Sequence, residues 1–306
     1  MSPLDQPDRH CVAEQIRELL DRAAAHDGIA PLSERFRMLV DDPGEARTVA
    51  RREADGAVAA YGARLPEGTI ELVVAPNRRR LGLGTTVLRD LLRDGDAHAD
   101  TVWAHGNLPA AQAFAARHHL VPIRRLHKMT RELTATDAAT SVHFPDGFEL
   151  RAFAPGDEDA WLAVNAAAFA THPEQGRVGR QELAALMAQP WFDPADLLML
   201  WGPDGQLAGS HWTKIDPRER VDGMPAGEVY VLALAPAWQG FGIAAPLTVA
   251  GLRHVAAQGL RAVVLYVDED NPRAVATYRR LGFGTLTVDA QYARDGGPGL
   301  VPSRRN

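Results

Sequence analysis

Apolar residues form two strand-like runs that lie 160 positions apart in similar surroundings. Residues 69–76 (TIELVVAP) and 229–236 (VYVLALAP) are rich in β-branched and other apolar side chains, and both end in Ala-Pro. A turn with small residues follows each run, and residues 85–95 and 245–259 then show the apolar spacing of a helix. The pattern therefore predicts a strand–turn–helix unit that occurs twice.

The similarity continues beyond both helices. Residues 100–106 and 261–270 are predicted strands, and the second is apolar without alternation, as in a strand buried on both faces. A helix is expected after each strand, because Asn271 is a good N-cap and Pro272 a good first helical residue. Asn107, 164 positions earlier, is expected to be the counterpart of Asn271. Both copies are therefore predicted to belong to the α/β class.

The chain is long enough for two domains of ordinary size, since it has 306 residues. Helical lead-ins precede the two copies at residues 11–28 and 157–172. Residues 132–147, which lie between the copies, are rich in Thr, Ala and Asp, which is typical of a linker. We therefore expect a boundary near residue 140, with domains at residues 1–140 and 141–306.

The composition is that of a soluble globular protein, with 46% hydrophobic and 24% charged residues. No apolar run approaches the roughly 18 residues of a membrane span, and the polar N-terminus does not resemble a signal or transit peptide. A single cysteine excludes an internal disulfide and a cysteine-based metal site. The net charge of −6 argues against a general nucleic-acid binder. We expect a cytoplasmic monomer that binds neither membranes nor nucleic acid.

The two turns predict an anion site. The pattern R-x-x-G-x-G at residues 79–84 matches Q-x-x-G-x-A at residues 239–244. Backbone N–H groups at a strand-to-helix turn point outward at the positive end of the helix dipole, and larger side chains would keep a phosphate away. An ordinary tight turn is the alternative for one copy, but two matching copies favour the phosphate site. The basic run at residues 78–80 is expected to serve a small anionic ligand.

The spacing of the glycines decides between kinds of phosphate site. The dinucleotide fingerprint needs a third glycine where Val87 stands, and the chain has no Gly-Lys-Ser/Thr P-loop. The pattern instead resembles the pyrophosphate signature of the GCN5-related N-acetyltransferases. Both copies also resemble this family in the strand before the turn and in the downstream Asn-x-x-Ala helix, at residues 107–110 and 271–274.

The resemblance implies two tandem domains of the family's α/β fold, each with a mixed central sheet flanked by helices. It implies that the turn amides hold the pyrophosphate of acetyl-CoA, and that the preceding strand binds the pantetheine arm and acetyl carbonyl. The second copy's donor residues would be Leu232, Ala233, Leu234, Gln239, Gly240, Phe241, Gly242, Ile243, Ala244, Ala245, Asn271, Pro272, Arg273, Ala274, Val275 and Ala276. The first copy would hold a second, non-reacting acetyl-CoA at Leu72, Val73, Val74, Arg80, Leu81, Gly82, Leu83, Gly84 and Thr85. No metal is implied.

The resemblance also assigns catalytic groups to the second copy. Glu228 is expected to act as the base through water, because an α-amine has a pKa of about 8. Tyr278 is expected to protonate the departing thiolate, and a backbone N–H at residues 232–234 to bind the oxyanion. A solvated glutamate and a core aromatic are the alternatives. The first copy has Gly68 and Phe114 at the matching places, so we expect it to be inactive.

Short segments of the second half are similar to one kind of tandem member of this family. They are residues 171–177 (THPEQGR), 210–214 (SHWTK), 227–231 (GEVYV), 265–267 (LYV) and 271–283 (NPRAVATYRRLGF). That kind acetylates the cysteinyl amine of a cysteinyl-glucosaminyl-inositol. The acceptor residues this implies are Glu34, Glu174, Lys214, Glu228 and Tyr266. Another acceptor (a protein N-terminus, an aminoglycoside or a polyamine) stays open, as does a module that only senses coenzyme A.

The remaining candidates for chemistry are histidines and the single cysteine. The histidines weighed for a metal site lack the required spacing and are expected to be structural or surface residues; they are His118, His119, His143, His172 and His211. Cys11, in the N-terminal lead-in, is expected to be a buried thiol without a role.

Overall fold

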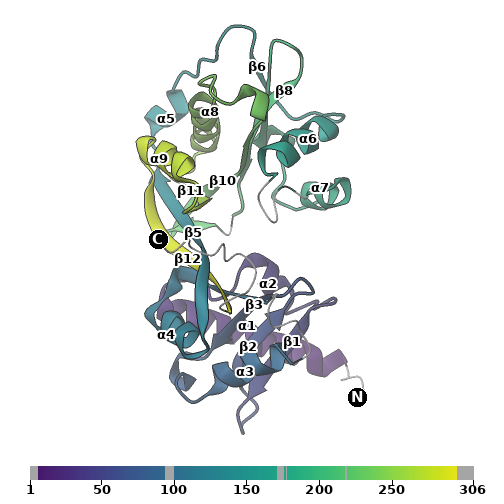
Figure 1. Cartoon of the computed structure of the whole chain (residues 1–306), viewed down its shortest axis with the longest axis vertical. Coiled ribbons are helices and arrows are strands. Elements are labelled where there is room, and N and C mark those ends of the chain that lie inside the picture. The colour runs from purple at the N-terminus through teal and green to yellow at the C-terminus, as the bar shows by residue number, and fades with distance from the viewer. Residues whose placement is uncertain (1–5, 94–99, 171–175, 177, 218, 295–306) are drawn as a thin grey trace, which may run out of the picture. The chain divides into compact units, whose positions relative to one another are not determined.

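The computed structural model describes residues 6–93, 100–170, 176, 178–217 and 219–294 (Figure 1). The chain divides into two compact units. Unit 1 comprises residues 1–127, 268–270 and 287–306, and unit 2 comprises residues 128–267 and 271–286. The boundary expected near residue 140 divides the chain into two continuous domains. The two units differ from this division, because unit 1 also contains residues 268–270 and 287–306.

Unit 1 is built on a mixed sheet with the strand order β1-β2-β3-β4-β12. Strands β1, β2 and β3 pair antiparallel, β3 and β4 pair parallel, and β4 and β12 pair antiparallel. Its elements are α1 (Gln6–Asp27), α2 (Glu34–Met38), β1 (Arg47–Arg52), β2 (Val58–Arg64), β3 (Thr69–Val74), η1 (Pro76–Arg78), α3 (Leu83–Leu91), β4 (Thr101–Ala104), η2 (His105–Asn107), α4 (Pro109–Arg117), the first part of β5 (Leu120–Glu132) and most of β12 (Gly284–Arg294).

Helices cover both faces of the sheet in unit 1, as the period-2 pattern of its strands requires. Along β2, Tyr61 packs in one apolar cluster with Leu19 of α1, while the neighbouring Ala60 packs in another with Leu88 of α3. Successive side chains therefore enter opposite cores, and almost the whole of β2 is buried.

The strands of unit 2 follow the order β5-β11-β10-β8-β7-β6, with β9 paired to β10. Strands β6, β7, β8 and β10 pair antiparallel, and β10 and β11 pair parallel. Its elements are the end of β5, α5 (Ala135–Ala139), β6 (Glu149–Ala152), α6 (Glu158–Ala168), α7 (Arg180–Met187), η4 (Pro194–Asp196), β7 (Leu197–Trp201), β8 (Leu207–Lys214), β9 (Arg220–Val221), β10 (Met224–Leu234), η5 (Pro236–Trp238), α8 (Ala244–Ala257), β11 (Ala262–Asp268), α9 (Pro272–Arg280) and the start of β12.

Two cores lie on the two faces of the sheet in unit 2. Trp161 of α6 packs against Trp212 of β8, with their ring centroids 5.5 Å apart, and both side chains are fully buried. Helices α8 and α9 contribute Val255 and Val275 to another cluster, where they meet Val263 of β11. Strand β11 is buried along most of its length, as the unalternating apolar sequence predicted.

The long strands that end the two repeats are exchanged. Strand β5 follows α4 of unit 1 but is the neighbour of β11 in unit 2. Strand β12 follows α9 of unit 2 but pairs with β4, where Ala290 lies opposite Ala104 and Ala293 opposite Thr101. The sheet of unit 1 is therefore completed by the last described strand of the chain.

The α/β class with mixed sheets and flanking helices is confirmed by this architecture. Within the described ranges, no helix is both long and apolar enough to cross a membrane. Cys11 lies on α1 and is exposed, so the expectation of a buried thiol was wrong.

Candidate active site

The two small-residue turns have the same backbone conformation. In unit 1, Arg80 and Gly82 have φ values of +68° and +85°, and in unit 2 Gly240 and Gly242 have values of +87° and +76°. A Cβ atom added at Gly82 or Gly242 would meet nothing within 4 Å, so both turns border open space. Helices α3 and α8 begin directly after them, and first-turn N–H groups of a helix have no intrahelical partner. Each turn therefore presents free amides to a ligand.

The strand before each turn diverges from its parallel neighbour. Pairing of β10 with β11 ends at Val229 and Leu265, although β10 continues to Leu234. Pairing of β3 with β4 likewise ends at Ile70 and Val102. On its other edge, β10 stays paired with β8 up to Leu234. The backbone at residues 232–234 thus has one edge in the sheet and one edge open, which suits a ligand with amide groups of its own.

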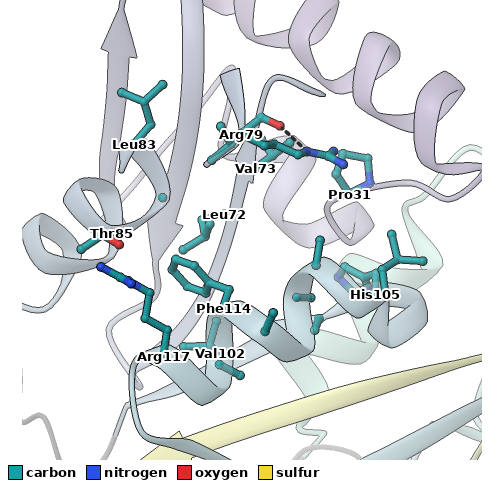
Figure 2. A pocket seen from close by; sticks show the side chains of 18 of the residues that line it. Pro31, Leu72, Val73, Arg79, Leu83, Thr85, Val102, His105, Phe114 and Arg117 are labelled. Atoms are coloured by element: carbon teal, nitrogen blue, oxygen red, sulfur yellow. Dashed lines mark hydrogen bonds between the residues drawn. The ribbon is translucent and has the colours of Figure 1, made fainter. Parts of the chain in front are cut away.

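In unit 1 the divergence of β3 and β4 is continuous with a cavity of about 380 Å³. Figure 2 shows Leu72 and Val73 of β3, Thr85 after the turn, and Phe114 of α4 around it. The cavity brings together nearly all the donor residues predicted for the first copy: Leu72, Val73, Val74, Arg80, Gly82, Leu83, Gly84 and Thr85. Leu81 does not line it and is 66% exposed.

Two of the three arginines in the basic run are already neutralised. Arg78 is paired with Glu53, and Arg79 donates two hydrogen bonds to Asp27, at 2.8 and 2.6 Å. The hydrogen bond to Asp27 is the main reason that the pKa of Arg79 is raised. Arg80 is exposed and lines the cavity. The run was expected to serve an anionic ligand as a whole, and the ion pairs leave that role chiefly to Arg80.

In unit 2 the predicted donor residues offer mainly backbone. The side chains of Ala233, Ile243 and Val275 are buried, with at most 8% exposure, so they cannot themselves meet a ligand. Phe241 is 56% exposed and lies against Trp238, with ring centroids 5.2 Å apart. Apolar packing of Phe241 and Ile243 therefore holds the turn, and the groups that the turn offers to a ligand are its backbone amides.

The second helix of the repeat matches at an offset of 163, not 164. Helices α4 and α9 begin at Pro109 and Pro272, and a left-handed residue follows the C-cap of each, His119 (φ +55°) and Gly282 (φ +87°). The side chain of Asn271 caps α9, accepting a hydrogen bond from the N–H of Ala274 at 3.1 Å.

The expected match of Asn107 with Asn271 was therefore wrong by one residue. The N-cap of α4 is Leu108, and the side-chain oxygen of Asn107 instead accepts a hydrogen bond from the hydroxyl of Tyr292, at 2.7 Å. The counterpart of Tyr278 is then Ala115 rather than Phe114. Ala115 also lacks a hydroxyl, so the absence of a phenol in the first copy remains.

Tyr278 lies in the last turns of α9. It shares an apolar cluster with Leu232 and Ala274, and its ring centroid is 5.7 Å from that of Phe283. Burial raises the pKa of Tyr278 to about 12. The phenol therefore carries its proton throughout the physiological pH range, as a proton donor must.

Glu228 lies on β10 just before the divergence from β11. It is half-buried and faces Lys214 across the antiparallel pair with β8. Lys214 is 8% exposed, and its Nζ atom lies 4.7 Å from the ring centroid of Trp191 and 5.5 Å from that of Tyr230. The carboxylate and the ammonium thus occupy one face of the sheet.

Comparison with known proteins agrees with this geometry. The acetyltransferase (GNAT) family matches residues 161–283. A mycothiol acetyltransferase of Nocardia farcinica is 44% identical, covering 93% of this chain and 94% of that protein. Another, from Geodermatophilus obscurus, is 44% identical and covers 90% and 92% of the two chains. This chain belongs to the mycothiol acetyltransferase family. It is accordingly an N-acetyltransferase.

Solved structures share the fold of this mycothiol acetyltransferase family member. A GCN5-related N-acetyltransferase from Sphaerobacter thermophilus superposes with a TM-score of 0.70 at 24% identity, covering 95% of this chain and 94% of that chain. A tandem GNAT protein from the clavulanic acid biosynthesis pathway gives 0.67 at 18% identity, with 96% and 97% covered. At these identities the structures support the tandem GNAT fold alone.

The acceptor residues suggested by the resemblance to this family are only partly placed. Lys214, Glu228 and Tyr266 lie in unit 2, with Tyr266 on β11 immediately after the last β10–β11 pair. Glu34 is the first residue of α2 in unit 1. Glu174 lies outside the described residues. Among the described residues, no group of His, Cys, Asp and Glu is arranged to hold a metal ion.

Sequence reasoning missed two charged groups of this family member. Lys128 of β5 bonds Glu219, and the scarcity of lysine in the chain was the signal that could have found it. His105 lies between Asp289, 2.9 Å from its Nδ1 atom, and Glu71, 3.3 Å from its Nε2 atom. No local signal marks this second group, because its members are 34 and 184 positions apart.

The charge of His105 is expected to make unit 1 sensitive to high pH. Burial alone would lower the pKa of His105, but Asp289 and Glu71 raise it to about 10. A histidine pKa raised above its unfolded value of about 6.5 stabilises the fold fully below pH 6.5, and this contribution is lost as the pH rises toward 10. His105→Gln should lower the free energy of unfolding by about 3 kcal/mol at pH 6 and by clearly less at pH 10. Urea unfolding at the two pH values measures this; an equal loss at both would contradict it.

Proposed function

We propose that this chain transfers the acetyl group of acetyl-CoA to the cysteinyl amine of a cysteinyl-glucosaminyl-inositol, giving mycothiol and coenzyme A. The observation that carries the proposal is the 44% identity to mycothiol acetyltransferases over nearly the full length of both chains. Glu228 on β10 and Tyr278 on α9 support the chemistry of amine acetylation in unit 2.

The donor fits the turn and the open strand edge of unit 2. The amides that follow Gly242 suit its pyrophosphate, and the free edge at residues 232–234 suits the amides of its pantetheine arm. When bound, acetyl-CoA supplies the thioester. An N–H of the open edge is then placed to donate to the acetyl oxygen as negative charge develops there.

The acceptor amine has to lose a proton before it can attack. An α-amine has a pKa of about 8, so most of it is protonated at neutral pH. Glu228 accepts that proton through a water molecule, since a carboxylate needs only a short relay to remove protons from an amine of this pKa. Lys214 lies directly opposite Glu228 on β8, so a positive charge balances the carboxylate on this face of the sheet.

Tyr278 acts on the leaving group. A phenol with a pKa of about 12 is a weaker acid than a thiol, whose pKa is about 8.5, so full proton transfer to a free thiolate is uphill by about 5 kcal/mol. Its hydroxyl therefore donates a hydrogen bond to the sulfur as the C–S bond breaks. When the proton moves to the departing coenzyme A, a proton from solvent restores the phenol.

Unit 1 is proposed to hold a second acetyl-CoA that does not react. Its cavity of about 380 Å³ has the same turn and diverging strands as the site in unit 2. However, Gly68 stands where unit 2 has Glu228, and Ala115 where it has Tyr278. Without a base or a phenol at these places, bound donor would stabilise the fold by linkage only.

Within unit 2, the acceptor pocket is proposed to include Lys214, Glu228 and Tyr266. Glu34 and Glu174 are proposed as further acceptor residues on the resemblance alone. Carboxylates suit a cationic amine, and the lysine and tyrosine suit the hydroxyl groups of an amino sugar and inositol. We further propose a cytoplasmic monomer with no nucleic-acid or membrane partner, and sedimentation at micromolar concentration tests the monomer.

A panel of amines tests the proposed function. Release of coenzyme A from acetyl-CoA is measured with cysteinyl-glucosaminyl-inositol, with a protein N-terminal peptide, with an aminoglycoside and with spermidine. We expect turnover with the first and little with the others. Turnover with only one of the other amines would show that this amine, and not cysteinyl-glucosaminyl-inositol, is the acceptor. No turnover with any amine would favour a module that senses coenzyme A.

Replacing Tyr278 by phenylalanine should lower kcat by about 10²-fold and leave the Kd for acetyl-CoA nearly unchanged, because the hydroxyl acts on the leaving group. Steady-state kinetics and calorimetry measure the two quantities. Tyr292→Phe is the control, since it removes a phenolic hydroxyl from unit 1 and should leave kcat unchanged. Loss of acetyl-CoA binding by a folded Tyr278→Phe variant would make Tyr278 a binding residue.

A further inference from the structure

The two lysines of the chain lie in matching surroundings. Lysine and arginine together number 33, yet Lys128 and Lys214 are the only lysines in the sequence. Both belong to unit 2, and each ammonium faces a tyrosine ring at 5.5 Å from its centroid: Lys128 over Tyr266 and Lys214 over Tyr230. Lys214 is already an expected acceptor residue, whereas no role is assigned to Lys128.

Lys128 is held on two sides. Its Nζ atom lies 2.9 Å from a carboxylate oxygen of Glu219, and its side chain is only 19% exposed. Burial by itself would lower the pKa of Lys128, but the neighbouring Tyr266 and Glu219 together raise it. The ammonium therefore stays charged and lies between the carboxylate of Glu219 and the ring of Tyr266.

Tyr266 is placed where a ligand would pass. It follows Leu265, the last β11 residue paired with β10, so it lies where the two strands begin to diverge. The residue is 43% exposed. The pKa of its hydroxyl is raised to about 12, first by partial burial of that group and then by Glu228 and Glu219, against the opposing effect of Lys128. The phenol thus lies within electrostatic reach of both the proposed base and the Lys128 ammonium.

The choice of lysine has a physical reason. An ammonium is compact and has three donors that can point in different directions, so it can serve a carboxylate and a phenol while lying over a ring. A guanidinium is planar, larger and best suited to a carboxylate fork. The other 31 of the 33 lysine and arginine side chains are arginines. The two lysines are the ones that lie over Tyr266 and Tyr230.

We propose that Lys128 is a positioning residue for the acceptor: tethered by Glu219, its ammonium fixes the hydroxyl of Tyr266 at the acceptor side of unit 2. This inference rests on the proposed function, because Tyr266 is an acceptor residue only if unit 2 acetylates an amine. It predicts that Lys128 affects binding of the acceptor but not binding of acetyl-CoA, whose proposed contacts lie on β10, on the turn and at the start of α9.

A double-mutant cycle tests the proposal. Lys128→Met keeps the length of the side chain and removes its charge, and Tyr266→Phe keeps the ring and removes its hydroxyl. Each change should raise the KM for the acceptor by about 10-fold and leave the KM for acetyl-CoA within about twofold. Because Lys128 acts through the hydroxyl, the double variant should show the same KM as Tyr266→Phe alone.

Arg131→Met provides the matched control. Arg131 lies three residues further along β5 and forms an ion pair with Asp137. Its replacement removes a positive charge and an ion pair from the same strand, but it leaves Lys128 and Tyr266 in place. Its KM values should stay at the wild-type level. Lys128→Arg, which keeps the charge but changes the shape, should restore less than half of the lost acceptor affinity.

Independent effects would overturn the proposal, that is, a 10-fold effect of Lys128→Met that persists in the Tyr266→Phe background. An unchanged acceptor KM in Lys128→Met would overturn it as well. The proposed function is tested separately, by the turnover of the wild-type protein with the panel of amines. The double-mutant cycle is then run with the amine that the wild type acetylates.

Discussion

Replacing Gly242 by aspartate is expected to abolish acetyl transfer in a protein that still folds. A carboxylate at this position would occupy the space in front of the turn amides and repel the pyrophosphate of the donor. The fold should tolerate it, because a Cβ at Gly242 meets no atom within 4 Å and aspartate accepts a positive φ better than most residues. The release of coenzyme A should fall by at least about 10³-fold, and circular dichroism checks the fold.

Gly82→Asp is the matched control in unit 1. Its φ of +85° is close to the +76° of Gly242, and the space around it is equally open, so the two substitutions carry a similar backbone cost. We expect Gly82→Asp to keep most of the activity while losing acetyl-CoA binding at the cavity of unit 1. If Gly82→Asp were the inactive variant and Gly242→Asp the active one, the catalytic unit would be unit 1.

The second large effect is expected for Glu228→Gln. The amide cannot accept a proton, so kcat/KM should fall by roughly 10²-fold at pH 6.5, where most of the acceptor amine is protonated. The deficit should shrink above pH 9, because the amine with a pKa of about 8 is then already neutral. A pH–rate profile of the variant beside the wild type measures this.

A constant deficit across the pH range would indicate that Glu228 binds the acceptor without deprotonating it. A profile identical to that of the wild type would remove Glu228 from the mechanism. Glu149→Gln on β6 is the control, since it removes an exposed strand carboxylate of the same unit and should leave the profile unchanged.

The turns were predictable from the sequence because their signals are local. Small residues at 82 and 84, and at 240, 242 and 244, follow an apolar run in both copies, and their conformations agree. The error at Asn107 was local as well. Asn107 and Leu108 are both possible N-caps for the helix there. Pro109, the first residue of α4, aligns with Pro272 and so indicates the offset of 163 that the structure has.

Other features depend on contacts that no local pattern encodes. Strands β5 and β12 each follow the last helix of a repeat, so nothing in their own residues says that they exchange partners. The group formed by Glu71, His105 and Asp289 exists only because β12 pairs with β4. The ion pairs of Arg78 and Arg79 likewise needed the positions of Glu53 and Asp27, which come from distant segments.

The return of β12 to unit 1 sets the order in which the protein can mature on the ribosome. Translation delivers the helices and strands β1 to β4 of unit 1 first, but β4 keeps an unpaired edge until residues 287–294 emerge. The N-terminal half should therefore remain open to chaperones and proteases through most of synthesis. A truncated chain ending before residue 284 should be degraded in cells, even though it contains the whole catalytic turn of unit 2.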